Sequence, residues 1–126
     1  MSLHHFSFPT AITFGAGARK AVALHLVSAG ITRPLVVTDQ GLAGLPLTAE
    51  LEHDLRAGGL SPGKFAGVRG NPTASQVAAG VEAFRAHQAD AVVGLGGGAA
   101  LDVAKAVALM AVHDGAILDY AWDHPQ

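Results

Sequence analysis

Short apolar runs alternate along this chain with longer stretches in which apolar residues recur at helical spacing. Residues 35–38, 65–68 and 91–95 form such runs and are predicted to be β-strands. The stretches between them are predicted to be amphipathic helices. Because strands that alternate with helices are typical of βαβ units, the sequence predicts an α/β fold with a Rossmann-like, mostly parallel sheet flanked by helices.

Each of the first three predicted helices has one apolar face. These faces consist of Ala18, Ala21, Val22, Leu26 and Ala29 in the first helix, Leu47, Leu51 and Leu55 in the second, and Val77, Val81 and Phe84 in the third. Gly30 and Gly58 follow the first two helices, where glycine favours a left-handed C-terminal cap. Residues 73–76 (TASQ) match a capping box. Near the start of the chain, Pro9 interrupts an alternating pattern over residues 6–14, which predicts an edge strand or a bent pair.

The last predicted unit carries the strongest candidate chemistry. Its strand, residues 91–95, leads through Gly96, Gly97 and Gly98 into a helix predicted from Ala99 to about Val112. This arrangement places unhindered backbone N–H groups at the positive end of a helix, which is typical of phosphate binding. A glycine triplet at such a turn is also common where close packing alone is required, so both interpretations stay open.

An acidic residue about 20 positions after the glycine pattern normally binds the ribose of a dinucleotide. Asp114 has that spacing from Gly94, Gly96 and Ala99, but no second strand precedes it. Asp39 is the better candidate, because it ends a strand and follows the glycine turn at residues 15–17 by a suitable distance. Both glycine loops are candidates for one nucleotide site. The alternative for Asp39 is an ordinary turn-forming role.

Other polar residues have simple structural explanations. Asp102 and Lys105 have the spacing of an ion pair on one helix, and Asn71 with Pro72 forms an ordinary turn sequence. The seven histidines show no helical metal-ligand spacing, so no metal site is predicted from them. No catalytic residue is assigned.

Composition narrows the function classes. A chain of 126 residues is the size of one domain, and its 50% hydrophobic and 14% charged residues are typical of a packed globular protein. The net charge of −2, without a basic cluster, argues against a nucleic-acid partner. Neither a membrane-spanning run nor a signal peptide is expected. The absence of cysteine is compatible with a reducing compartment, so a cytoplasmic location is expected.

Residues 96–105 (GGGAALDVAK) resemble the GGGSxxDxAK signature of the iron-containing, metal-dependent alcohol dehydrogenases. Residues 14–18 (FGAGA), 37–39 (VTD) and 71–73 (NPT) occur in the order and spacing of that family. The resemblance covers essentially the whole chain. It implies a two-domain, NAD(P)-dependent oxidoreductase in which an all-helical C-terminal domain holds Fe²⁺ or Zn²⁺ through one Asp and three His.

By this resemblance, residues 1–126 correspond to the dehydroquinate-synthase-like N-terminal dinucleotide-binding domain. The chain is expected to be incomplete at its C-terminal end, to lack the helical domain and the metal ligands, and to be inactive alone. The resemblance assigns the pyrophosphate to the glycine turn, the adenosine ribose to Asp39, the lining of the nucleotide cleft to Asn71 and a place beside the cofactor to Asp102. The implied cofactor-binding residues are Asp39, Asn71, Gly96, Gly97, Gly98, Ala99 and Asp102.

The resemblance also bears on specificity. Asp39 should repel a 2′-phosphate and accept a hydrogen bond from a free 2′-hydroxyl, so NAD is expected rather than NADP. Ala99 replaces the serine of the signature and removes one hydroxyl donor, which should weaken cofactor binding. Asp102 favours an alcohol or aldehyde substrate, because maleylacetate reductases generally lack this Asp.

Several alternatives stay open at this point. The chain could be a non-catalytic nucleotide-binding module, or a relative of maleylacetate reductase or glycerol dehydrogenase. Dehydroquinate synthases are more distant options. An exposed apolar face could also lead to self-association, for example as a homodimer.

Overall fold

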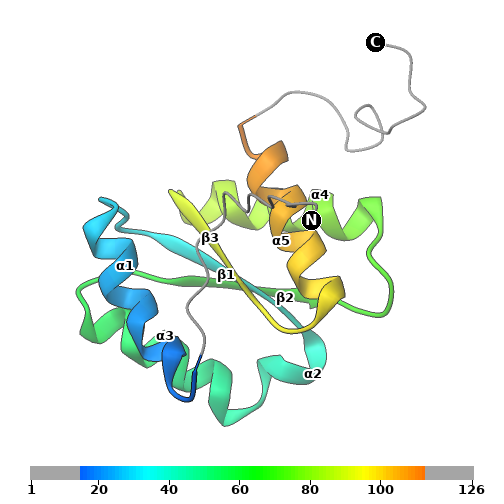
Figure 1. Cartoon of the computed structure of the whole chain (residues 1–126). Helices are drawn as coiled ribbons and strands as arrows, with labels where there is room; N and C mark the ends of the chain where they lie inside the picture. Colours follow the sequence, from blue (N-terminus) through cyan, green and yellow to red (C-terminus); the bar gives the residue numbers. More distant parts are fainter. Residues whose placement is uncertain (1–14, 113–126) are drawn as a thin grey trace, which may run out of the picture.

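The computed structural model describes residues 15–112, and within them a three-stranded parallel sheet forms the centre of the molecule (Figure 1). The sheet has the order β2-β1-β3. Its strands are β1 (Pro34–Asp39), β2 (Gly63–Val68) and β3 (Ala91–Leu95). The predicted α/β class and parallel sheet are therefore confirmed. The strand predicted over residues 6–14 and the candidate Asp114 lie outside the described residues.

The central strand, β1, is the most deeply buried part of the sheet. Its residues pair in parallel with both neighbours, for example Val36 with Lys64 of β2 and with Val93 of β3. Leu35, Val36 and Val37 are at most 1% exposed because a strand lies on each side and helices cover both faces. The residues of β3, which has one strand neighbour among the described residues, are only half-buried.

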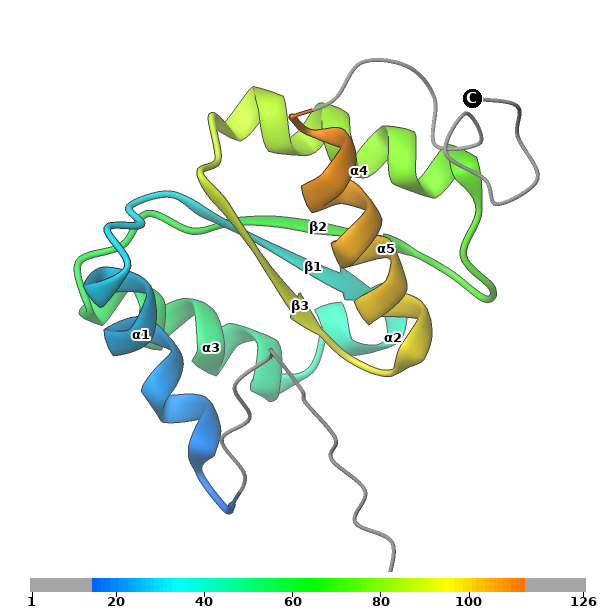
Figure 2. The ribbon, with the colours of Figure 1, turned by 45° about the horizontal axis from the view of Figure 1, so that its top comes forward.

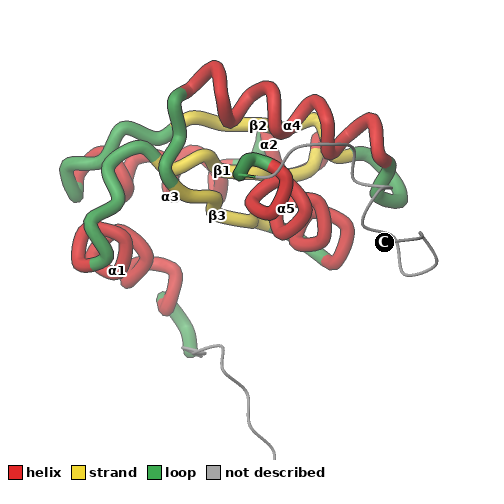
Figure 3. Tube along the Cα trace, turned by 90° about the horizontal axis from the view of Figure 1, so that it is seen from above, coloured by secondary structure: helices red, strands yellow, loops and turns green. Residues whose placement is uncertain are grey.

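Two helical layers cover the sheet. Figure 1 shows α4 and α5 on one face and α1 and α3 on the other, and Figure 3 shows the same layers from above. The bounds are α1 (Val22–Ser28), α3 (Pro46–Ala57), α4 (Ala74–His87) and α5 (Gly98–Met110), with a 3-10 helix, η1 (Ala18–Ala21), directly before α1. A short helix, α2 (Gln40–Ala43), follows β1.

Alternate residues of β1 supply two separate cores. Leu35 and Val37 pack with apolar residues of α4 and α5, whereas Val36 packs with Leu51 and Leu55 of α3. This alternation is the period of two that a strand imposes on its side chains. Burying both faces explains why the strand has a continuous apolar sequence rather than an alternating one.

The predicted helices differ from the observed ones at several ends. The first is split into η1 and α1, its Ala21 and Ala29 are exposed, and the rest of the predicted face is only half-buried. Leu47 is 38% exposed because it lies in the first turn of α3, while Leu51 and Leu55 are buried as predicted. Helix α5 already begins at Gly98, so the last glycine of the triplet belongs to the helix.

The capping box predicted at the start of α4 forms only in half. Thr73 Oγ1 accepts a hydrogen bond from Gln76 N at 3.2 Å, as the motif requires. The Gln76 side chain instead donates from Nε2 to the carbonyl of Arg69 at 2.7 Å. It therefore fastens the loop that precedes the helix rather than the cap residue itself.

The strand order places a topological switch point beside β1. The chain leaves β1 for β2 on one side and returns to β3 on the other side. In open α/β sheets, ligands bind in the crevice outside the carboxyl ends of the strands at such a point. Asp39, the last residue of β1, and Gly96, which follows β3, lie at this position.

Candidate functional site

The glycines at the end of β3 have distinct structural roles. A Cβ on Gly94 would lie 2.9 Å from Ala104 Cβ, so this glycine allows α5 to approach the strand closely. Gly96 has a φ of +139°, which L side chains rarely adopt, and it makes the sharp turn out of the strand. Both glycines are required by the local backbone and packing, as the structural interpretation of the motif proposed.

Gly97 and Gly98 are different, because nothing packs against them. Both are exposed, and a Cβ on either would meet no heavy atom within 4 Å among the described residues. Gly97 is the N-cap of α5, and no side chain caps this helix end. The first N–H groups of an α-helix have no intrahelical partners, so this end of α5 presents free donors and the positive end of the helix dipole.

Asp39 lies directly beside this glycine turn. Its Oδ1 accepts a hydrogen bond from Leu42 N at 2.8 Å and thereby caps α2. Its Oδ2 lies 3.3 Å from the position that a Cβ on Gly96 would occupy. Figure 2 shows α2 and the start of α5 next to each other at the carboxyl ends of β1 and β3. The structure thus gives Asp39 a turn-forming role and places its second carboxylate oxygen at the glycine turn.

Helix α2 was not predicted, and it supplies a wall of the site. Besides its N–H bond to Asp39, Leu42 places Cδ1 3.2 Å from the position of a Cβ on Gly96. Its carbonyl accepts a hydrogen bond from the buried Thr48 Oγ1 at 2.7 Å, which ties α2 to α3. Asp is a favoured N-cap residue, but this single signal is too weak to predict a helix of four residues.

The remaining predicted site residues lie around this centre. Asn71 is exposed in the loop between β2 and α4, and because β2 adjoins β1 this loop lies at the same edge of the sheet as Asp39. Ala99 is partly buried against the core, and Asp102 is exposed in the second turn of α5. Among the ion pairs of residues 15–112, none joins Asp102 to Lys105, so the simple ion-pair explanation does not hold.

The segment that follows the glycine turn at residues 15–17 forms its side-chain bonds away from this site. It leads into η1, where Arg19 Nη1 binds Glu50 Oε2 at 3.1 Å and the carbonyl of Leu47 at 3.4 Å. The bonds of this segment therefore go to α3.

Sequence reasoning also missed Gln40 and Arg69, which bind each other at the carboxyl ends of β1 and β2.

Neither a metal centre nor a membrane span is present in the part of the chain that the structure describes. Residues 15–112 contain no group of three or more His, Cys, Asp or Glu side chains that could hold a metal ion. No helix there has both the length and the apolar character needed to cross a bilayer. The polar groups at this site are backbone N–H donors and one carboxylate acceptor, a set that fits a phosphate and a ribose rather than a metal.

Comparison with known proteins identifies the family of this chain. A family model described as iron-containing alcohol dehydrogenase matches residues 9–126. NAD-dependent methanol dehydrogenase from Bacillus methanolicus is 37% identical over 116 residues, which cover 92% of this chain and 30% of that protein.

Two solved structures share the fold. NADH-dependent butanol dehydrogenase A from Thermotoga maritima has a TM-score of 0.84 at 32% identity, over 94% of this chain and 30% of that one. Sulfoacetaldehyde reductase from Bifidobacterium kashiwanohense, in complex with NAD⁺, has a TM-score of 0.86 at 28% identity, over 97% of this chain and 32% of that one. The chain thus spans about 30% of the length of these relatives.

Proposed function

The chain belongs to the iron-containing alcohol dehydrogenase family, and on that basis we propose that it forms the NAD-binding part of a metal-dependent dehydrogenase for small alcohols or aldehydes. The observation that carries this proposal is the position of the Asp39 carboxylate beside Gly96, next to two glycines whose surroundings are open. We assign residues 1–126 to the dinucleotide-binding domain of such an enzyme.

In this proposal the cofactor lies across the carboxyl ends of β3 and β1. Backbone N–H groups of Gly97, Gly98 and Ala99 bind the pyrophosphate, because the open space at the two glycines admits it and the end of α5 has unpaired donors. Asp39 Oδ2 accepts from the adenosine ribose while Oδ1 remains bonded to Leu42 N. We assign Asn71, in the loop after β2, to the lining of the nucleotide cleft and Asp102, in the second turn of α5, to a place beside the cofactor.

The bound nicotinamide supplies hydride transfer to or from the substrate carbon. The contribution of these residues is to bind and orient the dinucleotide, so we assign none of them to the chemical step. Fe²⁺ or Zn²⁺ would be held by residues other than those at 15–112, which provide no suitable group. On this proposal the chain alone has no dehydrogenase activity.

Further parts of the proposal rest on the relatives and the composition. An alcohol or aldehyde substrate is supported by relatives that include a methanol dehydrogenase and a butanol dehydrogenase. A cytoplasmic location is supported by the absence of cysteine. No nucleic-acid partner is proposed, because the chain has a net charge of −2. A homodimer would cover exposed apolar residues such as Leu24.

A fluorescence titration of the purified chain with NADH and NADPH tests the proposal. Saturable binding with NADH preferred is expected. Asp39→Gly should reduce the preference for NADH, because it removes both the acceptor for a free 2′-hydroxyl and the charge that repels a 2′-phosphate. Asp39→Asn should have a similar effect while preserving the cap of α2, since Asn caps helices as well as Asp does.

Asp90→Asn provides the matched control. It makes the same charge change at the amino end of β3, the far end of the sheet from Gly96, and should leave both affinities unchanged. Binding of neither dinucleotide, or an unchanged preference in both Asp39 variants, would contradict the proposed site. NADH binding by a longer protein that oxidises no alcohol would favour a non-catalytic nucleotide-binding module.

A further inference from the structure

An arginine directly follows the strand that pairs with β1, which carries the acid of the proposed ribose site. Asp39 of β1 is the register partner of Val68 of β2, so the residues that follow them, Gln40 and Arg69, are neighbours at the carboxyl edge. Arg69 Nε and Nη2 both donate to Gln40 Oε1, at 3.1 and 2.9 Å. The guanidinium of Arg69 is thereby attached to the residue directly after Asp39.

Arg69 is held at its backbone as well as at its side chain. Its carbonyl accepts the 2.7 Å hydrogen bond from Gln76 Nε2 at the start of α4. Two contacts from two different helices therefore fix its position. Since a free arginine side chain carries about 2 kcal/mol of rotamer entropy, such fixing lowers the cost of binding a ligand there.

The positive charge of Arg69 has no carboxylate partner within residues 15–112. The ion pairs of that region involve Arg19, Arg56 and Lys64. The partner of Arg69 is a neutral amide oxygen, which orients the guanidinium but leaves its charge uncompensated. Arg69 is also exposed, so the charge is accessible to a ligand in the cleft.

This placement corresponds to a known chemical requirement. In dinucleotide-binding folds, an acid after a strand accepts from a free ribose 2′-hydroxyl, whereas a nearby arginine accommodates a 2′-phosphate. Gln40 has no charge of its own, but its side chain binds a cation at the residue directly after the acid. Asp39 and Arg69 together have no net charge, so the repulsion of a 2′-phosphate by Asp39 is opposed locally.

We propose that Arg69, held by Gln40, is a second determinant of cofactor choice, which lets this site accept NADPH alongside NADH. The inference rests on the proposed function, because it requires the dinucleotide to lie with its adenosine ribose at Asp39. It deepens that function by attributing the size of the preference for NADH to two opposing charges.

The ratio of the dissociation constants for NADPH and NADH measures the effect. Arg69→Ala should raise this ratio about tenfold, the size expected for loss of one hydrogen-bonded charge on a phosphate. Gln40→Ala should raise it about threefold, because the guanidinium keeps its charge but loses its anchor. The ratio for Arg69→Lys should lie between those of Arg69→Ala and the unmodified chain, since lysine binds phosphate only as a point charge.

Arg85→Ala is the matched control. Arg85 lies in the last turn of α4, at the opposite end of that helix from Arg69, and its removal makes the same charge change. It should leave the ratio unchanged. Thermal melting of each variant, followed by circular dichroism, identifies any that fail to fold, and Arg69→Lys and Gln40→Ala then provide the test.

A double variant separates this inference from the proposed function. Asp39→Gly should improve NADPH binding, and the added change Arg69→Ala should remove most of that improvement. Equal ratios for Arg69→Ala and Arg85→Ala, or an improvement that survives in the double variant, would overturn the role of Arg69 while NADH binding remained intact. Failure of the unmodified chain to bind either dinucleotide would instead overturn the proposed function, and this inference with it.

Discussion

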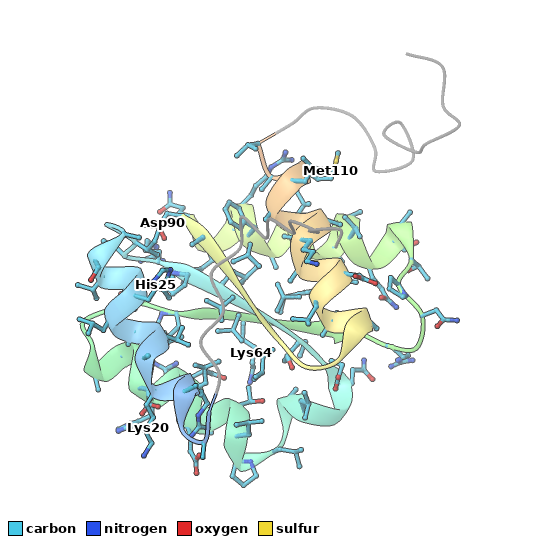
Figure 4. The ribbon with its side chains drawn as sticks, viewed as in Figure 1. Lys20, His25, Lys64, Asp90 and Met110 are labelled. Atoms are coloured by element: carbon cyan, nitrogen blue, oxygen red, sulfur yellow. The ribbon has the colours of Figure 1, made fainter. Side chains whose placement is uncertain are left out.

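The two ends of the sheet use their polar groups in opposite ways. At the amino end, Asp90 accepts hydrogen bonds from Thr32 N and Arg33 N, both at 2.8 Å, and from Thr32 Oγ1 at 3.0 Å. Asp90 lies directly before β3, and Figure 4 shows it at that end of the strand. One carboxylate thus joins β3 to the segment that enters β1.

His87 extends this network to β2. Its Nε2 lies 2.8 Å from the carbonyl of Ser61, and because a carbonyl can only accept, we assign the ring proton to Nε2. Arg33 Nε donates to the His87 carbonyl at 3.0 Å. The amino ends of all three strands and the end of α4 are therefore connected through polar groups that bind one another.

At the carboxyl end the corresponding groups are left open. Within residues 15–112, no atom lies within 4 Å of the position of a Cβ on Gly97 or Gly98, and no side chain caps the start of α5. Asp39 uses one carboxylate oxygen for α2 and has the other at the glycine turn. The polar groups at the amino end thus connect the strands to one another, whereas at the carboxyl end the start of α5 and one oxygen of Asp39 are the groups that the proposed function assigns to a ligand.

The largest expected effect is at Gly96. Gly96→Val should lower the free energy of unfolding by about 2 to 4 kcal/mol, because a β-branched residue is strained at this φ and its Cβ would crowd Ala100 and Leu42. Chemical denaturation measures the loss. NADH binding should disappear as the turn is displaced.

Gly97→Ala separates the ligand site from the fold. Its φ of −82° suits any residue and its Cβ would contact no protein atom, so the stability should change by less than about 0.5 kcal/mol. The added methyl group would instead occupy the approach of the pyrophosphate and weaken NADH binding. If Gly97→Ala binds NADH normally, the cofactor does not pass over this turn and the functional half of the comparison fails.

At the amino end, the expected loss of stability is smaller than that of Gly96→Val. A Cβ on Gly63 would lie 2.7 Å from Cγ of His87, so Gly63→Ala must displace the ring from Ser61 and Arg33. We expect a loss of about 1 to 3 kcal/mol in the free energy of unfolding and no change in NADH binding. Gly44→Ala is the control, because a Cβ there meets no atom. Equal stability of the two variants would contradict a structural role for the His87 network.

Strands with a continuous apolar sequence, and the residues near their ends, could be predicted from the sequence. Residues 91–95 were predicted with the observed bounds because β3 is continuously apolar, and Asp39 and Gly96 were both identified from their places after strands. Strand β2 begins two residues before its predicted start, because Gly63 and Lys64 interrupt its apolar pattern.

Features that depend on tertiary contacts were not predictable. Helix α2 has four residues and contains Gly41, so its sequence has too little helical signal for a prediction. The bond between Gln40 and Arg69 joins residues 29 positions apart and depends on the register of β1 against β2. Periodicity locates strands and helices but does not determine which residues become neighbours at the edge of the sheet.

The smallest expected effect concerns the pH dependence of the amino end. Partial desolvation acts to raise the pKa of Asp90, but the hydrogen bonds from the Thr32 and Arg33 backbones and from the Thr32 hydroxyl outweigh it, so the pKa lies below its ordinary value.

A carboxyl whose pKa is lower in the folded state adds stability above its unfolded pKa of about 3.9 and loses it as the pH falls through the folded value. Asp90→Asn should therefore cost about 1 kcal/mol near neutral pH, at the low end for charge-assisted bonds because the site is exposed. Urea denaturation of both proteins from about pH 7 to about pH 3 should show this difference shrinking toward acid. A difference that stays constant over this range would mean that the charge of Asp90 does not strengthen its bonds to Thr32 and Arg33.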